Sequence, residues 1–182
     1  MGTNSNGFTL FELIIIIGIL GIASAVAAPS LVTMIANNRI SASANDFVAA
    51  LQLAKAETAA RVNPVTICKK NAAGNECVGD GDWSQGWIVF SDANGDGSVD
   101  GADDPILLNH EALHPQITFG GTAGVQDSIT YRPSGTTSLD STEVLIMCDD
   151  RLFGDSAKGI LVTITGRGAV MKATDTDQIS CL

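Results

Sequence analysis

An unbroken apolar run near the N-terminus constrains this chain more than any other feature. From Leu13 to Ala28 every residue is apolar or small except Ser24, and about twenty such residues suffice for a helix to span a bilayer. One carboxylate, Glu12, lies at the start of this run. A lone charge in such a segment costs roughly 2.5–3.5 kcal/mol or more on insertion scales. We therefore expect a membrane-spanning helix in which Glu12 has a partner or a function.

Two ordinary kinds of segment also contain an apolar run. A secretory signal peptide has a basic start and a small-residue cleavage site. Residues 25–28 imitate the cleavage site, but no Lys or Arg precedes the run and Glu12 interrupts its start. A plain single-pass anchor would not need Glu12. Both stay as alternatives to a more specific interpretation.

The run Gly7-Phe8-Thr9-Leu10-Phe11-Glu12 and the apolar segment after it resemble the signature of type IV pilins and pseudopilins. The resemblance implies that a prepilin peptidase cuts between Gly7 and Phe8 and methylates the new amine of Phe8. Cleavage creates a cation at Phe8, which Glu12 of a neighbouring subunit can pair with in low dielectric. That pairing would set the axial register of a filament.

Two further features of the N-terminal segment bear on this resemblance. Pro29 matches a proline that is frequent in the family, and proline kinks or locally melts a helix. The leader, residues 1–7, departs from the family because it contains no basic residue. The positive-inside rule therefore gives little support for the orientation in the membrane.

Past Pro29 the pattern predicts an amphipathic helix and then β-strands. One helical face carries apolar residues, namely Ile40, Ala44, Phe47, Val48, Leu51 and Ala54. Asn63-Pro64 should end this helix, because residues before proline avoid helical angles. The expected strands are 65–69, 86–91, 106–109, 117–120, 129–132, 144–148, 160–165 and 169–173. We expect an α+β fold in which the amphipathic helix packs on the β-domain.

Later motifs sharpen the family resemblance. Trp83-x-x-Gly86-Trp87, Tyr131-x-Pro133-x-Gly135, Cys148-Asp149-x-Arg151 and Gly166-Arg167 resemble the GspH/FimT branch of the superfamily. The resemblance implies a type IV pilin-like fold, with a long N-terminal helix packed on an antiparallel β-domain. The expected parts are a leader (1–7), a transmembrane and filament-core helix (8–29), an amphipathic helix (30–62) and a periplasmic β-domain (63–182).

Four cysteines permit three disulfide pairings. The region past the membrane helix should lie in an oxidising periplasm, where disulfides persist. We favour Cys68–Cys77, which closes a short polar loop, and Cys148–Cys181, which holds the C-terminus to a strand. A structural zinc site is the alternative, although no C-x-x-C spacing occurs.

An acidic loop matches the spacing of a twelve-residue calcium loop. Its candidate ligands are Asp92, Asn94, Asp96, Ser98, Asp100 and Asp103, with Gly97 at the turn position. The last position holds Asp rather than the usual bidentate Glu, and the flanking segments look like strands rather than helices. The alternative is an acidic hairpin loop, whose Asp and Gly residues favour turns. The chain requires no other cofactor.

His110-Glu111-Ala112-Leu113-His114 spells the H-E-x-x-H signature of zinc proteases. That chemistry needs both histidines on one helical face and a third ligand. Pro105 and Pro115 leave little room for a helix, and the chain has no further histidine. We interpret both histidines as surface residues and expect no enzyme.

Gly166-Arg167-Gly168-Ala169 resembles the G-R-x-R element through which some FimT proteins bind DNA, but Ala169 replaces the second arginine. The chain has ten basic and twenty acidic residues, a net charge of −10. Contacts to phosphates require cations or other donors. The sequence therefore argues against nucleic acid as a partner, with a solvated Arg167 in a hairpin turn as the simpler interpretation.

The sequence thus predicts a structural subunit, a FimT/FimU-like minor pilin that takes part in filament assembly. The resemblance implies other minor pilins or pseudopilins, the major subunit, the prepilin peptidase and an inner-membrane assembly platform as partners. It also implies a single pass through the bacterial inner membrane before assembly into a filament. A GspH-like pseudopilin of type II secretion is the first alternative, and a DNA-binding minor pilin in DNA uptake is the second.

Overall fold

The computed structural model describes residues 7–151, 154, 156–175 and 181. Within these residues, one long helix, α1 (Leu10–Arg61), precedes eight strands and three short 3-10 turns. The chain forms two compact units, Met1–Asn38 and Arg39–Leu182, whose boundary falls inside α1. Helix α1 ends two residues before Asn63, because Val62 adopts a left-handed conformation (φ 57°) and Pro64 follows.

The strands of the second unit form two antiparallel sheets. The first sheet has the order β3-β2-β1-β5, and the second has the order β4-β6-β7-β8. Their bounds are β1 (Val65–Lys69), β2 (Trp87–Ser91), β3 (Ile106–His110), β4 (Thr118–Gly121), β5 (Ser128–Tyr131), β6 (Glu143–Cys148), β7 (Lys158–Val162) and β8 (Gly168–Lys172). Each differs from its expected range by only a few residues, and the α+β class is confirmed.

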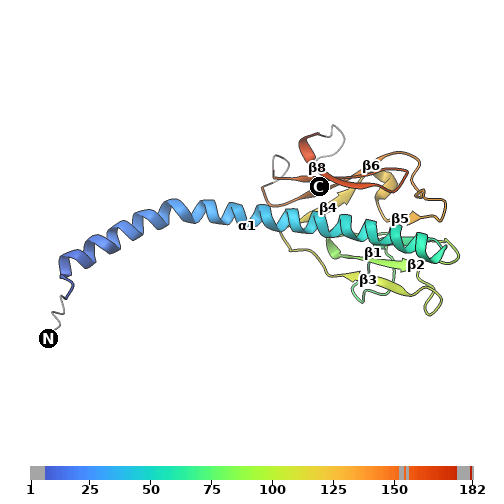
Figure 1. Cartoon of the computed structure of the whole chain (residues 1–182), viewed down its shortest axis with the longest axis horizontal. Helices are drawn as coiled ribbons and strands as arrows, with labels where there is room; N and C mark the ends of the chain where they lie inside the picture. The colour runs from blue at the N-terminus through green and yellow to red at the C-terminus, as the bar shows by residue number, and fades with distance from the viewer. Residues whose placement is uncertain (1–6, 152–153, 155, 176–180, 182) are drawn as a thin grey trace, which may run out of the picture. The chain divides into compact units, whose positions relative to one another are not determined.

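One core joins both sheets to the helical segment of this unit. Figure 1 shows β1–β3 on one side of the segment from residue 39 to 61 and β4, β6 and β8 on the other. The expected apolar face is buried: Ile40, Ala44, Phe47, Leu51 and Ala54 have no exposed surface, and Val48 packs against the same core. The hydrophobic face therefore meets two sheets rather than one, which buries the helix deeply.

Phe47 lies at the centre of this core. Its ring makes edge-on contacts with Trp83, Trp87 and Phe119, at centroid distances of 5.2, 5.0 and 4.8 Å. Edge-to-face aromatic pairs contribute about 0.5–1.5 kcal/mol each beyond the burial of their surface. The Nε1 of Trp83 donates to the carbonyl of Val125 at 2.9 Å, so its polar atom is satisfied inside the core. These contacts tie the helix to elements from both sheets.

The strands at the middle of each sheet are buried on both faces. On the first sheet, Cys68, Ile88 and Phe90 form an outer cluster that Cys77 and Val99 complete. On the second sheet, Val144, Ile146 and Cys148 form another, with Ala157, Ala173, Leu161 and Cys181. Residues outside the strands, such as Val99, Ala157 and Cys181, therefore cover the face of each sheet that points away from the helix.

Two disulfides connect these covers to the sheets. The structure joins Cys68 to Cys77 and Cys148 to Cys181, with Cα–Cα distances of 5.6 and 5.9 Å. These are the pairings expected from the sequence, and they leave no free cysteine. Each bond closes a loop of the unfolded chain, which disfavours the unfolded state.

Gly166 permits a close contact in the last hairpin. Its φ of +71° lies in the left-handed region, and a Cβ there would lie 2.5 Å from Cε1 of Tyr131. The hydroxyl of Tyr131 donates to the carbonyl of Gly166, and burial raises the pKa of this hydroxyl. Gly135, in another turn, has a similar φ of +84° but nothing within 4 Å. The two glycines thus share a backbone conformation and differ in crowding.

Replacing each of these glycines with alanine separates the two effects. We expect Gly135→Ala to lower the free energy of unfolding by about 1–2 kcal/mol, from backbone strain alone. Gly166→Ala should lower the free energy of unfolding by about 1–3 kcal/mol more than Gly135→Ala does, because the added methyl group is too close to the ring of Tyr131. Denaturation of the full chain in detergent, followed by tryptophan fluorescence, measures both. Equal losses would contradict the packing argument.

Candidate functional site

The N-terminal end of α1 is closed by a pair of reciprocal hydrogen bonds. The backbone N–H of Glu12 donates to Oγ1 of Thr9 at 3.2 Å. In return, the N–H and the hydroxyl of Thr9 both donate to Oε2 of Glu12, at 3.0 and 2.9 Å. This is a capping box, which satisfies N–H groups that have no partner within the helix. It explains why the helix begins at Leu10.

The same contacts fix the position of the Glu12 carboxylate and engage one of its two oxygens. Both bonds from Thr9 go to Oε2, and no hydrogen bond to Oε1 is found among the residues that the structure describes. Phe8, immediately before the cap, has a side chain that is 81% exposed. The carboxylate is thus held at the end of the helix with one oxygen available to a further cation.

Between Phe8 and Ile35 the first unit exposes many large apolar side chains. By length and composition α1 qualifies as a candidate membrane span. Its large exposed apolar side chains are Phe8, Leu10, Phe11, Leu13, Ile14, Ile15, Ile16, Ile17, Ile19, Leu20, Ile22, Leu31, Val32, Met34 and Ile35. A surface of this kind is stable only in lipid or against other apolar helices.

Pro29 lies within α1, and the residues on both sides of it remain helical. Its carbonyl accepts a hydrogen bond from Oγ1 of Thr33 at 3.1 Å. Proline lacks the N–H that would continue the ladder, so this turn has one backbone bond fewer than its neighbours. The helix is not melted at Pro29.

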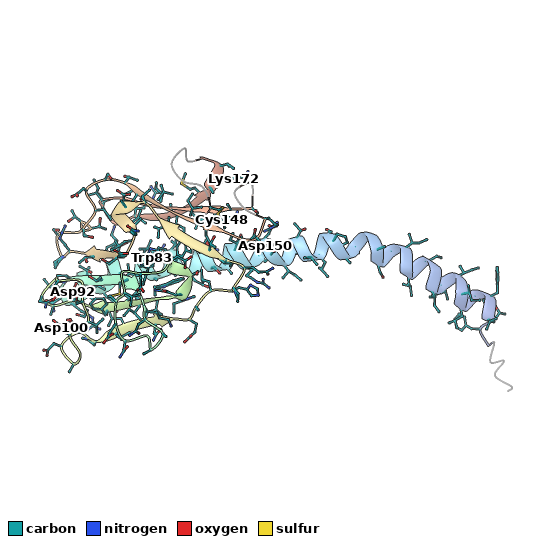
Figure 2. All side chains as sticks on the ribbon, turned by 180° about the vertical axis from the view of Figure 1, so that it is seen from behind. Trp83, Asp92, Asp100, Cys148, Asp150 and Lys172 are labelled. Carbon is teal, nitrogen blue, oxygen red and sulfur yellow. A yellow bond between two sulfur atoms is a disulfide. The ribbon has the colours of Figure 1, made fainter. Side chains whose placement is uncertain are left out.

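The acidic loop after β2 is organised around a buried carboxylate. Asp92 has no exposed surface, and it accepts hydrogen bonds from Oγ1 of Thr66 (2.7 Å), N of Gly95 (2.8 Å) and N of Gly97 (3.1 Å). Figure 2 places Asp92 and Asp100 together at one end of the second unit. Val99 of this loop packs on the outer cluster of the first sheet. The loop is thus a structural cover for that sheet.

The remaining carboxylates of the loop bind its own backbone and amide groups. Nδ2 of Asn94 donates to Asp96 and Asp100, at 3.0 and 2.9 Å, so an amide donor stands between two carboxylates. N of Ser98 donates to Asp96 at 2.8 Å. The second inward carboxylate is Asp104, 2% exposed, which accepts from N of Ala93 and N of Asp100 at 3.1 Å each.

These contacts differ from the expected calcium loop. Asp103, the expected last ligand, is exposed, and the neighbouring Asp104 points inward instead. Within residues 7–151, 154, 156–175 and 181, no group of three or more His, Cys, Asp or Glu side chains could hold a metal ion. The calcium prediction for Asp92, Asn94, Asp96, Ser98, Asp100 and Asp103 is therefore not supported. Hydrogen bonds within the acidic turn account for the spacing of its aspartate and asparagine residues.

The H-E-x-x-H sequence lies at the end of β3 and in the coil after it. His110 stacks on Trp87, with ring centroids 3.9 Å apart, and its Nε2 lies 3.7 Å from Oδ2 of Asp46. Nδ1 of His114 lies 3.2 Å from Nη1 of Arg39. The two histidines thus contact the helix through different partners. Their ring nitrogens do not converge on one site. The arrangement secures the segment after β3 to α1.

The last hairpin separates its basic residues. Lys158 and Lys172 are direct cross-strand partners at one end of the β7–β8 pair. Arg167 lies in the turn at the other end, where Thr163 and Gly166 close the bend, and its side chain is exposed. Because the three cations do not converge, the hairpin offers weak support for a phosphate backbone.

Sequence reasoning missed two residues of these sites. Thr9 was not recognised as the partner of Glu12, although Thr9-x-x-Glu12 is the sequence pattern of a capping box. The calcium-loop spacing selects Asp103, whereas the buried carboxylate is the adjacent Asp104, for which the sequence carries no separate signal. Only the path of the chain into β3 decides which of them points inward.

Comparisons with known proteins identify relatives of both parts of the chain. Residues 43–168 match the sequence profile of the family described as type II transport protein GspH. Residues 2–28 match the prokaryotic N-terminal methylation motif. No match is found among curated proteins.

Solved structures show a similar fold. Two crystal forms of the type IV minor pilin FimU from Pseudomonas aeruginosa are similar to this chain, with TM-scores of 0.60 and 0.57 and 18% sequence identity in both. The first covers 80% of this chain and 96% of the FimU chain, and the second covers 78% and 99%. This likeness concerns the fold.

Two aspartates of the acidic loop test its interpretation. Asp92→Ala should lower the free energy of unfolding by about 2–4 kcal/mol, because it leaves buried donors without a charged acceptor. Asp103→Ala should change it by less than about 0.5 kcal/mol, since Asp103 is exposed. Tryptophan fluorescence during denaturation, in a chelator and again in millimolar calcium, measures both. A calcium loop would instead be stabilised by calcium, and both variants would lose that stabilisation.

Proposed function

The chain belongs to the family of the type II transport protein GspH, and from this premise we propose that it is a minor pilin of a type IV pilus. It is a structural subunit that takes part in initiating or assembling the filament. The observation that carries this proposal is the Glu12 carboxylate, held at the start of an exposed apolar helix with one oxygen available. The methylation motif and the FimU-like fold support it.

Processing at the N-terminus would supply the partner of Glu12. A prepilin peptidase cuts between Gly7 and Phe8 and methylates the amine of Phe8, which remains a cation. Ion pairs strengthen as the dielectric falls, so an ammonium and a carboxylate attract strongly within an apolar bundle. The capping box keeps Glu12 at a defined position, and the ammonium of an adjacent subunit binds its other oxygen. Register along the filament follows from this pairing.

The rest of the chain would serve the same assembly. Residues 8–29 span the inner membrane before assembly and enter the filament core afterwards, with Pro29 within this passage. The β-domain lies in the periplasm, where the two disulfides persist. Its partners are other minor pilins, the major subunit, the prepilin peptidase and the inner-membrane assembly platform.

A pseudopilin of type II secretion is the second candidate, because the matching family is described by that transport role. The two candidates share processing, anchoring and fold, and they differ in what the filament does. Disruption of the gene distinguishes them. We expect loss of surface pili or twitching with normal secretion, and loss of secreted enzymes with intact pili would favour the pseudopilin.

A DNA-uptake receptor is the rival from a different class. It would depend on Arg167, with only Lys158 and Lys172 nearby on the hairpin. A gel-shift assay of the full chain in detergent, at micromolar protein and low salt, tests this rival. We expect no salt-dependent shift, because an acidic chain with separated cations releases few counterions from DNA.

Three substitutions separate the charge of Glu12 from its capping role. Glu12→Gln keeps an oxygen acceptor for Thr9 but removes the charge, whereas Thr9→Ala removes the cap and keeps the charge. We expect Glu12→Gln and Glu12→Ala to abolish incorporation into filaments, measured by immunoblotting of sheared or purified filaments. Thr9→Ala should reduce incorporation only partly, since a cap contributes about 0.5–2 kcal/mol.

N-terminal sequencing of the mature protein provides the control. Each variant should still begin at a methylated Phe8, which shows that processing is intact and that the defect lies in assembly. Normal incorporation of Glu12→Gln would contradict the ion-pair mechanism. A mature chain that begins elsewhere would contradict the processing site.

A further inference from the structure

A pocket of about 500 Å³ lies on the second unit, beside the end of β1 and the segment after β3. Apolar side chains of Ala72, Val78 and Ala112 line part of it. Lys70, Asp80 and Glu111 also line it and contribute one positive and two negative charges. Its size fits one long side chain with its adjoining peptide groups. None of these residues has a role in the proposed processing or in the pairing of Glu12.

Two adjacent buried lysines, Lys69 and Lys70, differ in how many of their hydrogen-bond donors are used within the described part of the chain. Nζ of Lys69 is buried and fully engaged, with the carbonyls of Gly79 and Gly81 at 3.1 Å and Oδ1 of Asp127 at 2.8 Å. The side chain of Lys70 is also buried, with 7% of its surface exposed. Its Nζ makes one hydrogen bond among the described residues, to Oδ1 of Asn109 at 2.8 Å, and lies 3.8 Å from Glu111. A buried ammonium has three donors, so Lys70 can still donate to an acceptor.

The two carboxylates of the pocket are available to a cation. The side chain of Glu111 is 92% exposed, and its one ion pair among the described residues is the 3.8 Å approach to Lys70. Asp80 is exposed, and no hydrogen bond or ion pair of its carboxylate is found within the described part of the chain. Exposed carboxylates with weak or no partners can bind an incoming cation without breaking strong contacts.

The charges that line the pocket are negative in sum. Lys70 contributes one positive charge, and Asp80 and Glu111 contribute two negative ones. A field of one sign attracts a partner of the opposite sign and repels anions. An anionic ligand for Lys70 is therefore disfavoured, and a neutral carbonyl is the acceptor that fits.

We propose that this pocket receives a lysine or arginine side chain from a protein partner. The aliphatic stem of that side chain packs on Ala72, Val78 and Ala112, and its cation binds Asp80 and Glu111. A backbone carbonyl of the same partner segment accepts a hydrogen bond from Lys70. The pocket is thus a docking site for a basic peptide segment, and it acts independently of the N-terminal helix.

The test uses the full chain in detergent micelles, with the methyl groups of alanine and valine labelled for NMR. Ala72, Val78 and Ala112 then report from inside the pocket. N-acetyl-arginine N-methylamide is the probe, and N-acetyl-norleucine N-methylamide keeps its carbonyls and an apolar stem but lacks the charge. We expect saturable shifts of these three methyls with the arginine probe and affinity at least about fivefold weaker with norleucine.

Two variants determine whether the charges carry the binding. Asp80→Asn with Glu111→Gln should bring the affinity for the arginine probe down to that for norleucine, and both positions are exposed, so the fold is preserved. Asp140→Asn, another exposed acid, is the matched control and should change nothing. Shifts spread over the whole surface, equal responses to both probes, or an unchanged affinity in the double variant would each overturn the proposal. None of these outcomes bears on filament incorporation.

Discussion

The second unit of the chain depends on the burial of one helical face between its two sheets. The segment of α1 from Ile40 to Ala54 supplies the centre of the core, and Phe47 contacts aromatic side chains from both sheets. Without this segment the inner faces of both four-stranded sheets would be exposed to water. The burial of such side chains is the dominant favourable term in folding. The helix that qualifies as a candidate membrane span therefore also supplies part of the core of the second unit.

The outer faces of the sheets are closed by less regular parts of the chain. The acidic loop covers one face through Val99 and is held in place by Asp92, while the disulfide to Cys148 holds Cys181 on the other. Hydrogen bonding within the turn thus gives the aspartates of this loop a structural role. The carboxylate of Asp92 satisfies backbone donors of the turn, and a buried charge of this kind must be hydrogen-bonded to be tolerated.

The proposed assembly chemistry combines two separate properties of one glutamate. Its hydrogen bonds with Thr9 define the first turn of the helix, and its remaining oxygen is available to a cation. From Leu13 to Ala28 every residue is apolar or small except Ser24, so the segment has few polar groups that could set the position of one subunit against the next. A single charge pair in low dielectric can do so, because an unpaired charge there carries a large penalty. The pocket near Lys70 adds a second kind of recognition, in which charge selects a partner at the protein surface.

Much of this protein is determined by local sequence. The periodicity of 40–54 and the β-rich segments punctuated by glycine and aspartate predicted the helix and the eight strands of the described residues, because these signals depend on neighbouring residues alone. The Gly–Phe–Thr–Leu–x–Glu signature likewise predicts the N-terminal site from local sequence. Only the tertiary structure decided that Asp104 points inward rather than Asp103, that Asn94 lies between two carboxylates, and that His110 and His114 face different partners. The pocket of Lys70, Asp80 and Glu111 likewise comes from segments far apart in the chain. Spacing along a chain records which side chains share a strand or helix face, but packing between distant segments decides which donors and acceptors meet.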